Sequence, residues 1–286
     1  MIGPDARREP RAANAAFSAW ALGATLLLLL FLALPLLGLL ARVPIADLAR
    51  HLGSPHVLQA LRLSLLSSVA ATAVVALLGT PAAYLLATRR FPGKRAIEVL
   101  VDLPMVLPPT VAGFALLMAF GRAGLAGHAL SLAGITLPFT TLGVIVAQVF
   151  MAAPFFVAPA RAGFAGVDRR LTDVAATLGA GERERFFRVM LPLARPTLLA
   201  GLAMSAARAL GEFGATITFA GNLPGTTQTM PLAVYVALQS DLDAAVALSV
   251  LLLLMSFGLL LGLRAAPAGW FWNRHDAPDS GQEAAR

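Results

Sequence analysis

The sequence contains no cysteine and has Lys94 as its only lysine among 286 residues. Without cysteine, the chain has neither a disulfide framework nor a thiolate metal site. Arg95 follows Lys94 and no glycine-rich loop leads up to it, so a Walker A phosphate-binding loop is excluded. The histidines are dispersed without metal-ligand spacing, and no serine lies in a nucleophile-elbow context. We therefore predict no catalytic residue, no metal site and no cofactor held by this chain.

Charged residues are also scarce, at 13% of the chain against 58% hydrophobic residues. A soluble domain carries about 25% charged residues, so this composition favours a protein that is solvated mainly by lipid. An apolar run of about 20 residues is long enough for a helix to cross a bilayer. Runs of this length predict an all-α polytopic membrane protein with six transmembrane helices: Ala19–Leu40, Leu61–Ala87, Ile97–Phe120, Thr141–Ala160, Pro196–Ala220 and Ala244–Leu263.

The first run follows several arginines, as the apolar core of a signal peptide would. It is longer than the roughly 7–15 apolar residues of a cleavable signal, so we interpret it as the first transmembrane helix. Met230–Gln239 is apolar but too short to span, and we expect an interfacial or re-entrant helix there. The predicted division is a cytoplasmic tail (1–18), a first helix with an outer loop (19–60), a transmembrane core (61–264) and a cytoplasmic tail (265–286).

The 22 basic residues are distributed unevenly among the segments that connect these helices. Most of them fall on one side of the membrane when the N-terminus is placed in the cytoplasm. The positive-inside rule therefore predicts that both termini are cytoplasmic. Because the net charge of +7 is explained by this topology, we expect contact with membrane lipid and no nucleic acid partner.

One cytoplasmic stretch, Thr172–Pro196, is far more polar than its surroundings. Apolar residues at i, i+3, i+4 and i+7 predict a short helix, which Asp168 can cap and which Gly179 can end in a left-handed conformation. A second short helix should follow and be broken by Pro192, and Pro196 should open the next membrane helix. These signals predict a helix–glycine–helix elbow at the inner face of the membrane. One interpretation of this elbow is an amphipathic linker that rests on lipid headgroups.

The spacing within the elbow is similar to that in the cytoplasmic loop of ABC importer permeases. The pattern of that loop is E-A-A, three residues, G, nine residues, I, one residue and L-P. Here Asp replaces Glu and Val replaces the first Ala, and every spacing is kept. The resemblance implies that the elbow, between the fourth and fifth transmembrane helices, forms coupling helices that dock in a cleft of an ATP-hydrolysing subunit. The candidate coupling residues are Asp173, Val174, Ala175, Gly179, Phe186, Phe187, Val189, Leu191 and Pro192.

A second stretch, Ala207–Tyr235, resembles the fifth helix and the following outer loop of molybdate permeases. It reads ARALGEFGATITFAGNLPGTTQTMPLAVY, and sulfate permease subunits share the R-A-L-G-E-F-G-A part. The similarity continues through DLPMVLPPTVAGFALL (Asp102–Leu117) and covers the chain from about Leu61 to Leu263. It implies a permease subunit of the bacterial inner membrane, in which two copies of the chain form the pathway. It further implies a dimer of ATPase subunits that use ATP and Mg²⁺, and an external or periplasmic molybdate-binding protein.

Three alternatives remain open at this point. The same machinery could carry sulfate, thiosulfate or tungstate in place of molybdate. An ion-coupled secondary transporter belongs to another class, which usually shows internal repeats and intramembrane carboxylates. No repeat is evident here, and Glu212 is the only clear acid in the middle of a span. A membrane scaffold without transport activity is the third alternative.

Arg208 and Glu212 lie four residues apart within the fifth span, where an unpaired charge costs at least about 2.5 kcal/mol. Their spacing allows a structural salt bridge, and a gate for an anion is the functional alternative. Thr216, Thr218 and Asn222 lie toward the outer end of the same span. They can offer weak dipoles to an oxyanion or hydrogen bonds to neighbouring helices. These five residues are the candidates for the translocation path or its gate.

Overall fold

The computed structural model describes residues 9–42 and 53–265, which form helices joined by turns and loops and contain no strand. The all-α prediction is therefore confirmed for the described residues. The first helix, α1, begins at Glu9, and its continuous apolar part begins at Phe17. The first eight residues of the predicted N-terminal tail lie outside the described residues. So do residues 266–286 of the predicted C-terminal tail.

Five helical segments of the described chain are long and apolar enough to cross a membrane. Each overlaps one of the predicted spans, and together they account for all of them except the third. Four are single helices and the remaining one, Glu182–Leu210, ends with α10. The long helices are α1 (Glu9–Ala41), α3 (Pro55–Thr88), α7 (Thr141–Ala165), α10 (Leu191–Leu210) and α13 (Leu242–Ala265).

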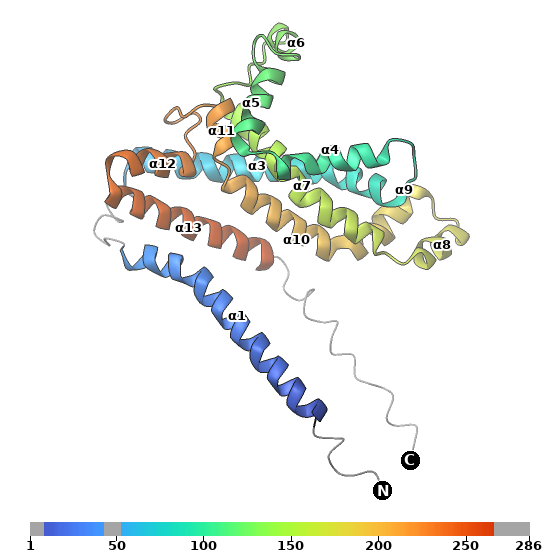
Figure 1. The fold of residues 1–286 in the computed structure, drawn as a ribbon. Coiled ribbons are helices and arrows are strands. Elements are labelled where there is room, and N and C mark those ends of the chain that lie inside the picture. Colours follow the sequence, from blue (N-terminus) through green and yellow to red (C-terminus); the bar gives the residue numbers. More distant parts are fainter. Residues whose placement is uncertain (1–8, 43–52, 266–286) are drawn as a thin grey trace.

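The core lies where α3, α7 and α10 pack against one another. Val75 from α3, Phe156 and Phe164 from α7, and Leu198 from α10 are buried together there. α13 packs beside α10, whereas α1 diverges from these helices in Figure 1. The apolar part of α1 has no buried residue, because α1 contacts the rest of the chain mainly near α13.

The third predicted span is not one helix, and this prediction was wrong. α4 (Lys94–Val106) and α5 (Pro109–Phe120) are separated at Leu107 and Pro108. Leu107 has φ −67° and ψ 132°, and Pro108 has φ −54° and ψ 132°. A residue that precedes proline is forced out of the α-helical region, and both of these residues precede one. Two consecutive prolines therefore end one helix and begin the next.

The fifth predicted span also has different bounds. It begins within a longer helical segment and is interrupted after Leu210, and a separate short helix, α11 (Gly214–Phe219), follows the interruption. The carboxylate of Glu212 lies in this interruption and accepts a hydrogen bond from the N–H of Ala215 at 2.8 Å. A side chain that satisfies a free N–H in the first turn of a helix favours a new start there. Glu212 therefore satisfies one of the free N–H groups at the start of α11.

α5 and α11 form a closely packed pair, and they project together from the layer of long helices in Figure 1. A Cβ atom at Gly113 of α5 would lie 2.6 Å from the carbonyl oxygen of Ala215. A Cβ atom at Gly214 would lie 2.7 Å from the Cβ of Pro109. Both distances are too short for a real side chain. Glycine at these two positions is what allows the two helices to approach each other.

The short helices lie at opposite ends of the long ones. α8 (Arg169–Thr177) and α9 (Glu182–Arg185) are at one end, and α12 (Met230–Ser240) is at the other (Figure 1). α12 is the short helix that the sequence predicted, and it packs against α3 and α13. The N–H of Met230 donates a hydrogen bond to Oγ of Ser64 on α3 at 2.7 Å. A further short helix, α6 (Gly127–Leu132), follows α5.

Candidate functional site

α8 is the first helix of the predicted elbow, and its ends carry the residues that the sequence indicated. The carboxylate of Asp168 accepts a hydrogen bond from the N–H of Arg170 at 2.9 Å and so caps the helix. Gly179 has φ 87°, a left-handed conformation that glycine adopts easily after a helix. The N–H of Ala180 donates to the carbonyl of Ala175 at 2.9 Å across this bend. The predicted helix–glycine bend is confirmed.

α8 turns apolar side chains outward instead of burying them. None of its residues is buried. Leu171 and Val174 are 49% and 57% exposed, and Leu178, just after the helix, is 82% exposed. Phe187, from the second half of the elbow, is 55% exposed. Several exposed apolar side chains on one otherwise polar segment are typical of a surface that binds a partner.

The second half of the elbow continues past Pro192, contrary to the prediction. α9, a π-helical turn (Phe186–Met190) and α10 follow one another as a single helical segment. The N–H of Leu191 donates to the carbonyl of Phe186, one residue further back than in an α-helix. Pro192 follows this irregular turn and lies in the first turn of α10, where a missing N–H is tolerated. Pro196 lies inside α10 and does not open it.

Phe186 packs inward, against the membrane helices. Its ring centroid lies 4.8 Å from that of Tyr84 on α3 and 6.0 Å from that of Phe164 on α7. The rings of Tyr84 and Phe164 are 5.7 Å apart and nearly perpendicular. Met190 is buried in the same group of side chains. Edge-to-face aromatic packing of this kind attaches the elbow firmly to α3 and α7.

The predicted coupling residues therefore do not share one surface. Phe186 packs against the membrane helices and is half-buried. The other predicted residues are either exposed or half-buried. Asp173, Val174, Gly179 and Phe187 are exposed, and Ala175, Val189, Leu191 and Pro192 are half-buried.

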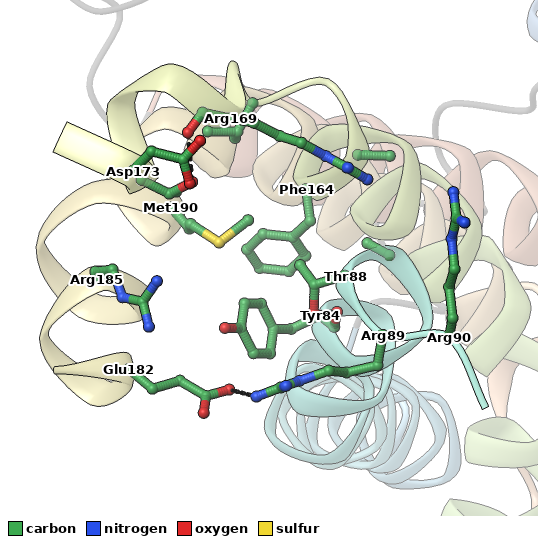
Figure 2. A pocket seen from close by; sticks show the side chains of 14 residues that line it. Tyr84, Thr88, Arg89, Arg90, Phe164, Arg169, Asp173, Glu182, Arg185 and Met190 are labelled. Atoms are coloured by element: carbon green, nitrogen blue, oxygen red, sulfur yellow. Dashed lines mark hydrogen bonds and ion pairs between the residues drawn. The ribbon is translucent and has the colours of Figure 1, made fainter. Parts of the chain in front are cut away.

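A cavity of about 470 Å³ separates the elbow from the adjoining ends of α3 and α7 (Figure 2). Across it, the guanidinium of Arg89 pairs with the carboxylate of Glu182, and both side chains are about half exposed. This hydrogen bond and the charge of Arg89 lower the pKa of Glu182, and Glu182 raises the pKa of Arg89 in turn. Arg185 also extends into the cavity. Its Nε atom is buried without a hydrogen-bond partner among the described residues.

Sequence patterns did not identify Arg89 or Tyr84 as part of the elbow. Arg89 is 93 residues away from Glu182 in the chain, so no helical or strand spacing relates them. The sole local signal is the position of Arg89, which directly follows the last residue of α3. Because the positive-inside rule already explains a basic residue at that place, the sequence gives no indication that Arg89 contacts Glu182.

Arg208 and Glu212 form the predicted salt bridge. Their closest side-chain nitrogen and oxygen atoms are 2.5 Å apart. Glu212 is fully buried, whereas the side chain of Arg208 is 23% exposed. The second oxygen of Glu212 accepts the hydrogen bond from Ala215 described above. One carboxylate thus neutralises a cation at the end of α10 and caps α11.

The remaining path candidates lie in α11 and just after it. The hydroxyl of Thr218 donates to the carbonyl of Gly214 at 2.9 Å, within α11. Thr216 is buried, and neither its hydroxyl nor Oδ1 of Asn222 has a hydrogen-bond partner among the described residues. Gln148 on α7, which the sequence did not indicate, is fully buried with both amide atoms unpaired in that part of the chain. In the same part of the chain, no cluster of His, Asp or Glu is suited to a metal ion.

Comparison with known proteins places these features in a family. Residues 79–265 match the family described as binding-protein-dependent transport system inner membrane component. The chain is 43% identical over 239 residues to the molybdenum transport system permease protein ModB of Mycobacterium tuberculosis, covering 83% of this chain and 90% of that protein. It is 44% identical over 159 residues to ModB of Escherichia coli K12, covering 55% of this chain and 69% of that protein.

The fold is also similar to that of a solved transporter. A bacterial alginate ABC transporter, in complex with an alginate pentasaccharide-bound periplasmic protein, matches with a TM-score of 0.72 at 17% identity. The match covers 90% of this chain and 95% of that chain. At this identity the likeness concerns the fold alone. The family match and the ModB relatives go further, and the chain belongs to the binding-protein-dependent transport system inner membrane components, which are multi-pass proteins of the bacterial inner membrane.

Proposed function

We propose that this chain forms the transmembrane pathway of an ATP-driven importer of molybdate. The observation that carries the proposal is the elbow, which exposes apolar side chains outward and is anchored inward by Phe186. Such a surface suits a soluble partner better than a lipid contact, because Asp173 lies within α8 and most of the segment is polar. The chain has no nucleotide-binding motif, so a partner subunit supplies ATP hydrolysis with ATP and Mg²⁺.

In this function a dimer of ATPase subunits binds the elbows of two copies of the chain. Val174, Leu178 and Phe187 fill an apolar recess of the ATPase, and Asp173 lies at the rim of the contact. When the ATPase subunits close on ATP, the elbows move with them, and the pathway opens toward the outside. An external binding protein then delivers the anion.

The outer segment of the chain is suited to weak binding of the anion. Gly221–Asp243, between α11 and the start of α13, contains no lysine or arginine that could trap a dianion. The cation nearest to it along the sequence, Arg208, is already neutralised by the buried carboxylate of Glu212. Tight and selective binding therefore belongs to the capture protein, and this chain discriminates weakly among tetrahedral oxyanions.

We assign Arg208 and Glu212 a structural role, because the charge of Arg208 is neutralised by the carboxylate of Glu212. Glu212 is fully buried and uses both oxygens, one for Arg208 and one for α11. Thr218 and Asn222 are half-buried in the isolated chain and remain the stronger path candidates. Thr216 is fully buried in the isolated chain and is a weaker one.

The substrate is tested with the complete complex in proteoliposomes, with its ATPase and its binding protein. Uptake of molybdate, tungstate and sulfate is compared at matched concentrations. We expect molybdate and tungstate to be taken up and sulfate to be taken up much less. Preferential uptake of sulfate would overturn the substrate, and uptake that persists without the ATPase would overturn the mechanism.

The docking surface is tested by a single charged substitution. Leu178→Glu places a charge on the exposed apolar face, and Leu125→Glu is the matched control, since Leu178 and Leu125 are 82% and 96% exposed. Leu125 belongs to the segment between α5 and α6, far from the elbow in Figure 1. We expect Leu178→Glu alone to lose the ATPase subunit during co-purification. Equal retention in both variants would refute docking through this face.

A further inference from the structure

The elbow is attached to the membrane helices at more than one point. It continues covalently into α10 through the π-helical turn. It is also held to α3 by the pair between Arg89 and Glu182. Arg89 is the residue that follows α3, and Glu182 is the first residue of α9. The pair therefore joins the end of one membrane helix to the start of the elbow's second helix.

The aromatic contacts lie on the same side as this ion pair. Phe186 is four residues after Glu182, one helical turn further along, so both side chains point toward α3. The ring of Phe186 meets Tyr84 of α3 at 4.8 Å. Figure 2 shows Tyr84 just above the pair formed by Glu182 and Arg89, among the side chains that line the cavity. The ion pair and the aromatic contact therefore both join the second half of the elbow to the end of α3, and they lie one helical turn apart.

Another ion pair of the elbow makes no such connection. Glu184 and Arg188 are four residues apart, and their side chains approach to 2.5 Å within the elbow. This pair can support the local helix but cannot link it to α3. It is consequently a matched comparison, because it has the same chemistry, lies in the same segment and is also solvent-exposed.

The covalent connection from the elbow to α10 passes through an irregular turn. The π-helical turn between α9 and α10 is a local irregularity of the hydrogen-bond ladder, and such turns are places where a helix bends. A push on the elbow can therefore be absorbed by bending before it reaches α10. A lateral contact to α3 avoids this turn.

We propose that Arg89 and Glu182 form a latch that passes movement of the elbow to α3 as well as to α10. Arg89 and Glu182 are positioning residues in this role, because they set where the elbow stands and do not contact the anion or ATP. The inference rests on the proposed function, in which an ATPase moves the elbow. It adds that α3, through residues outside the coupling motif, receives the movement directly. Without the latch, the ATPase should still bind the elbow and hydrolyse ATP, but less anion should be transported per ATP hydrolysed.

The test exchanges charges within each pair. Arg89→Glu and Glu182→Arg each place like charges together, and the double variant restores opposite charges in reversed order. The control set is Glu184→Arg, Arg188→Glu and their double variant. Three quantities are measured in the complete complex: co-purification of the ATPase, ATP hydrolysis stimulated by the binding protein, and molybdate taken up per ATP hydrolysed.

We expect each single variant of the latch to lower uptake per ATP by about 1.5- to fivefold, which is the range that an exposed ion pair can contribute to an equilibrium. The double exchange should restore the parent ratio, and the control set should leave it unchanged. Normal ratios in the single variants, or no recovery in the double variant, would overturn the latch. An equal loss in the control set would also overturn it.

Different results would contradict the latch and the docking surface. If the single latch variants lose the ATPase during co-purification, Arg89 and Glu182 belong to the docking surface, and the latch is wrong while docking stands. If Leu178→Glu retains the ATPase, docking through α8 is wrong whatever the latch variants do.

Discussion

Substitution of Gly179 by valine gives the sharpest test of the elbow as a moving part. Gly179 has φ 87°, and a Cβ added there would meet nothing within 4 Å. The added Cβ itself therefore creates no clash, and the expected effect of the substitution is on the backbone. A left-handed conformation costs a residue with a Cβ atom roughly 1–2 kcal/mol, and a β-branched side chain lies at the upper end.

A penalty of about 2 kcal/mol corresponds to roughly a thirtyfold change in an equilibrium constant, since 1.4 kcal/mol is tenfold. We expect Gly179→Val to disfavour the observed bend between α8 and α9 by this order. Membrane insertion should be unaffected, because the residue lies in the exposed elbow. Molybdate uptake should fall strongly, and ATP hydrolysis should become less dependent on the binding protein.

The chain offers a close control for this experiment. Gly93 has φ 82° and likewise would have no neighbour within 4 Å of an added Cβ. It precedes α4 and lies outside the elbow. Gly93→Val carries the same backbone strain, so it should lower stability without uncoupling hydrolysis from transport. Normal uptake and hydrolysis in Gly179→Val would refute the reasoning, and so would an equal loss of coupling in Gly93→Val.

Three further predictions concern other parts of the chain. Arg208→Ala or Glu212→Ala should each destabilise the protein by about 3–5 kcal/mol, because the pair includes a fully buried carboxylate. The yield of monodisperse protein after detergent extraction should therefore fall in each single variant. In the double variant this yield should recover partly. Gly113→Ala should lower the thermal unfolding temperature by forcing α5 away from α11, whereas Gly258→Ala, where an added Cβ meets nothing within 4 Å, should not. Because the pKa of Glu182 is lowered by Arg89, its pair is intact above the ordinary value of about 4.3 and is lost only as the pH falls through the lowered value. The distance between fluorophores on cysteines introduced in α3 and α9 should therefore stay constant from about pH 8 to about pH 6.

Local sequence signals predicted the first half of the elbow well because they act within a few residues. The cap at Asp168 and the bend at Gly179 each depend on the chemistry of a single side chain and its nearest backbone. The pair between Arg208 and Glu212 was predicted from their spacing of four residues, and it forms although Glu212 lies just past the end of α10. Hydropathy similarly located the long apolar helices, because crossing a membrane requires a continuous apolar run.

Hydropathy did not locate the two interruptions, because it averages over the residues that cause them. Pro108 and Pro109 are uncharged and lower the mean hydropathy of a long window only slightly, yet two successive prolines exclude a continuous helix. The break before α11 depends on the carboxylate of Glu212 reaching Ala215. The sequence-based prediction placed Glu212 inside a helix. It therefore did not anticipate that the carboxylate also binds the N–H of Ala215.

The division of the elbow into an outer and an inner side needed the fold itself. Periodicity describes Val174 and Phe186 alike as apolar residues of short helices. Their difference arises from α3 and α7, which place Tyr84 and Phe164 against Phe186 and leave α8 uncovered. An amphipathic linker on lipid needs only one apolar side. A segment that is anchored on one side and uncovered on the other can transmit a force between two bodies, as the proposed coupling role requires.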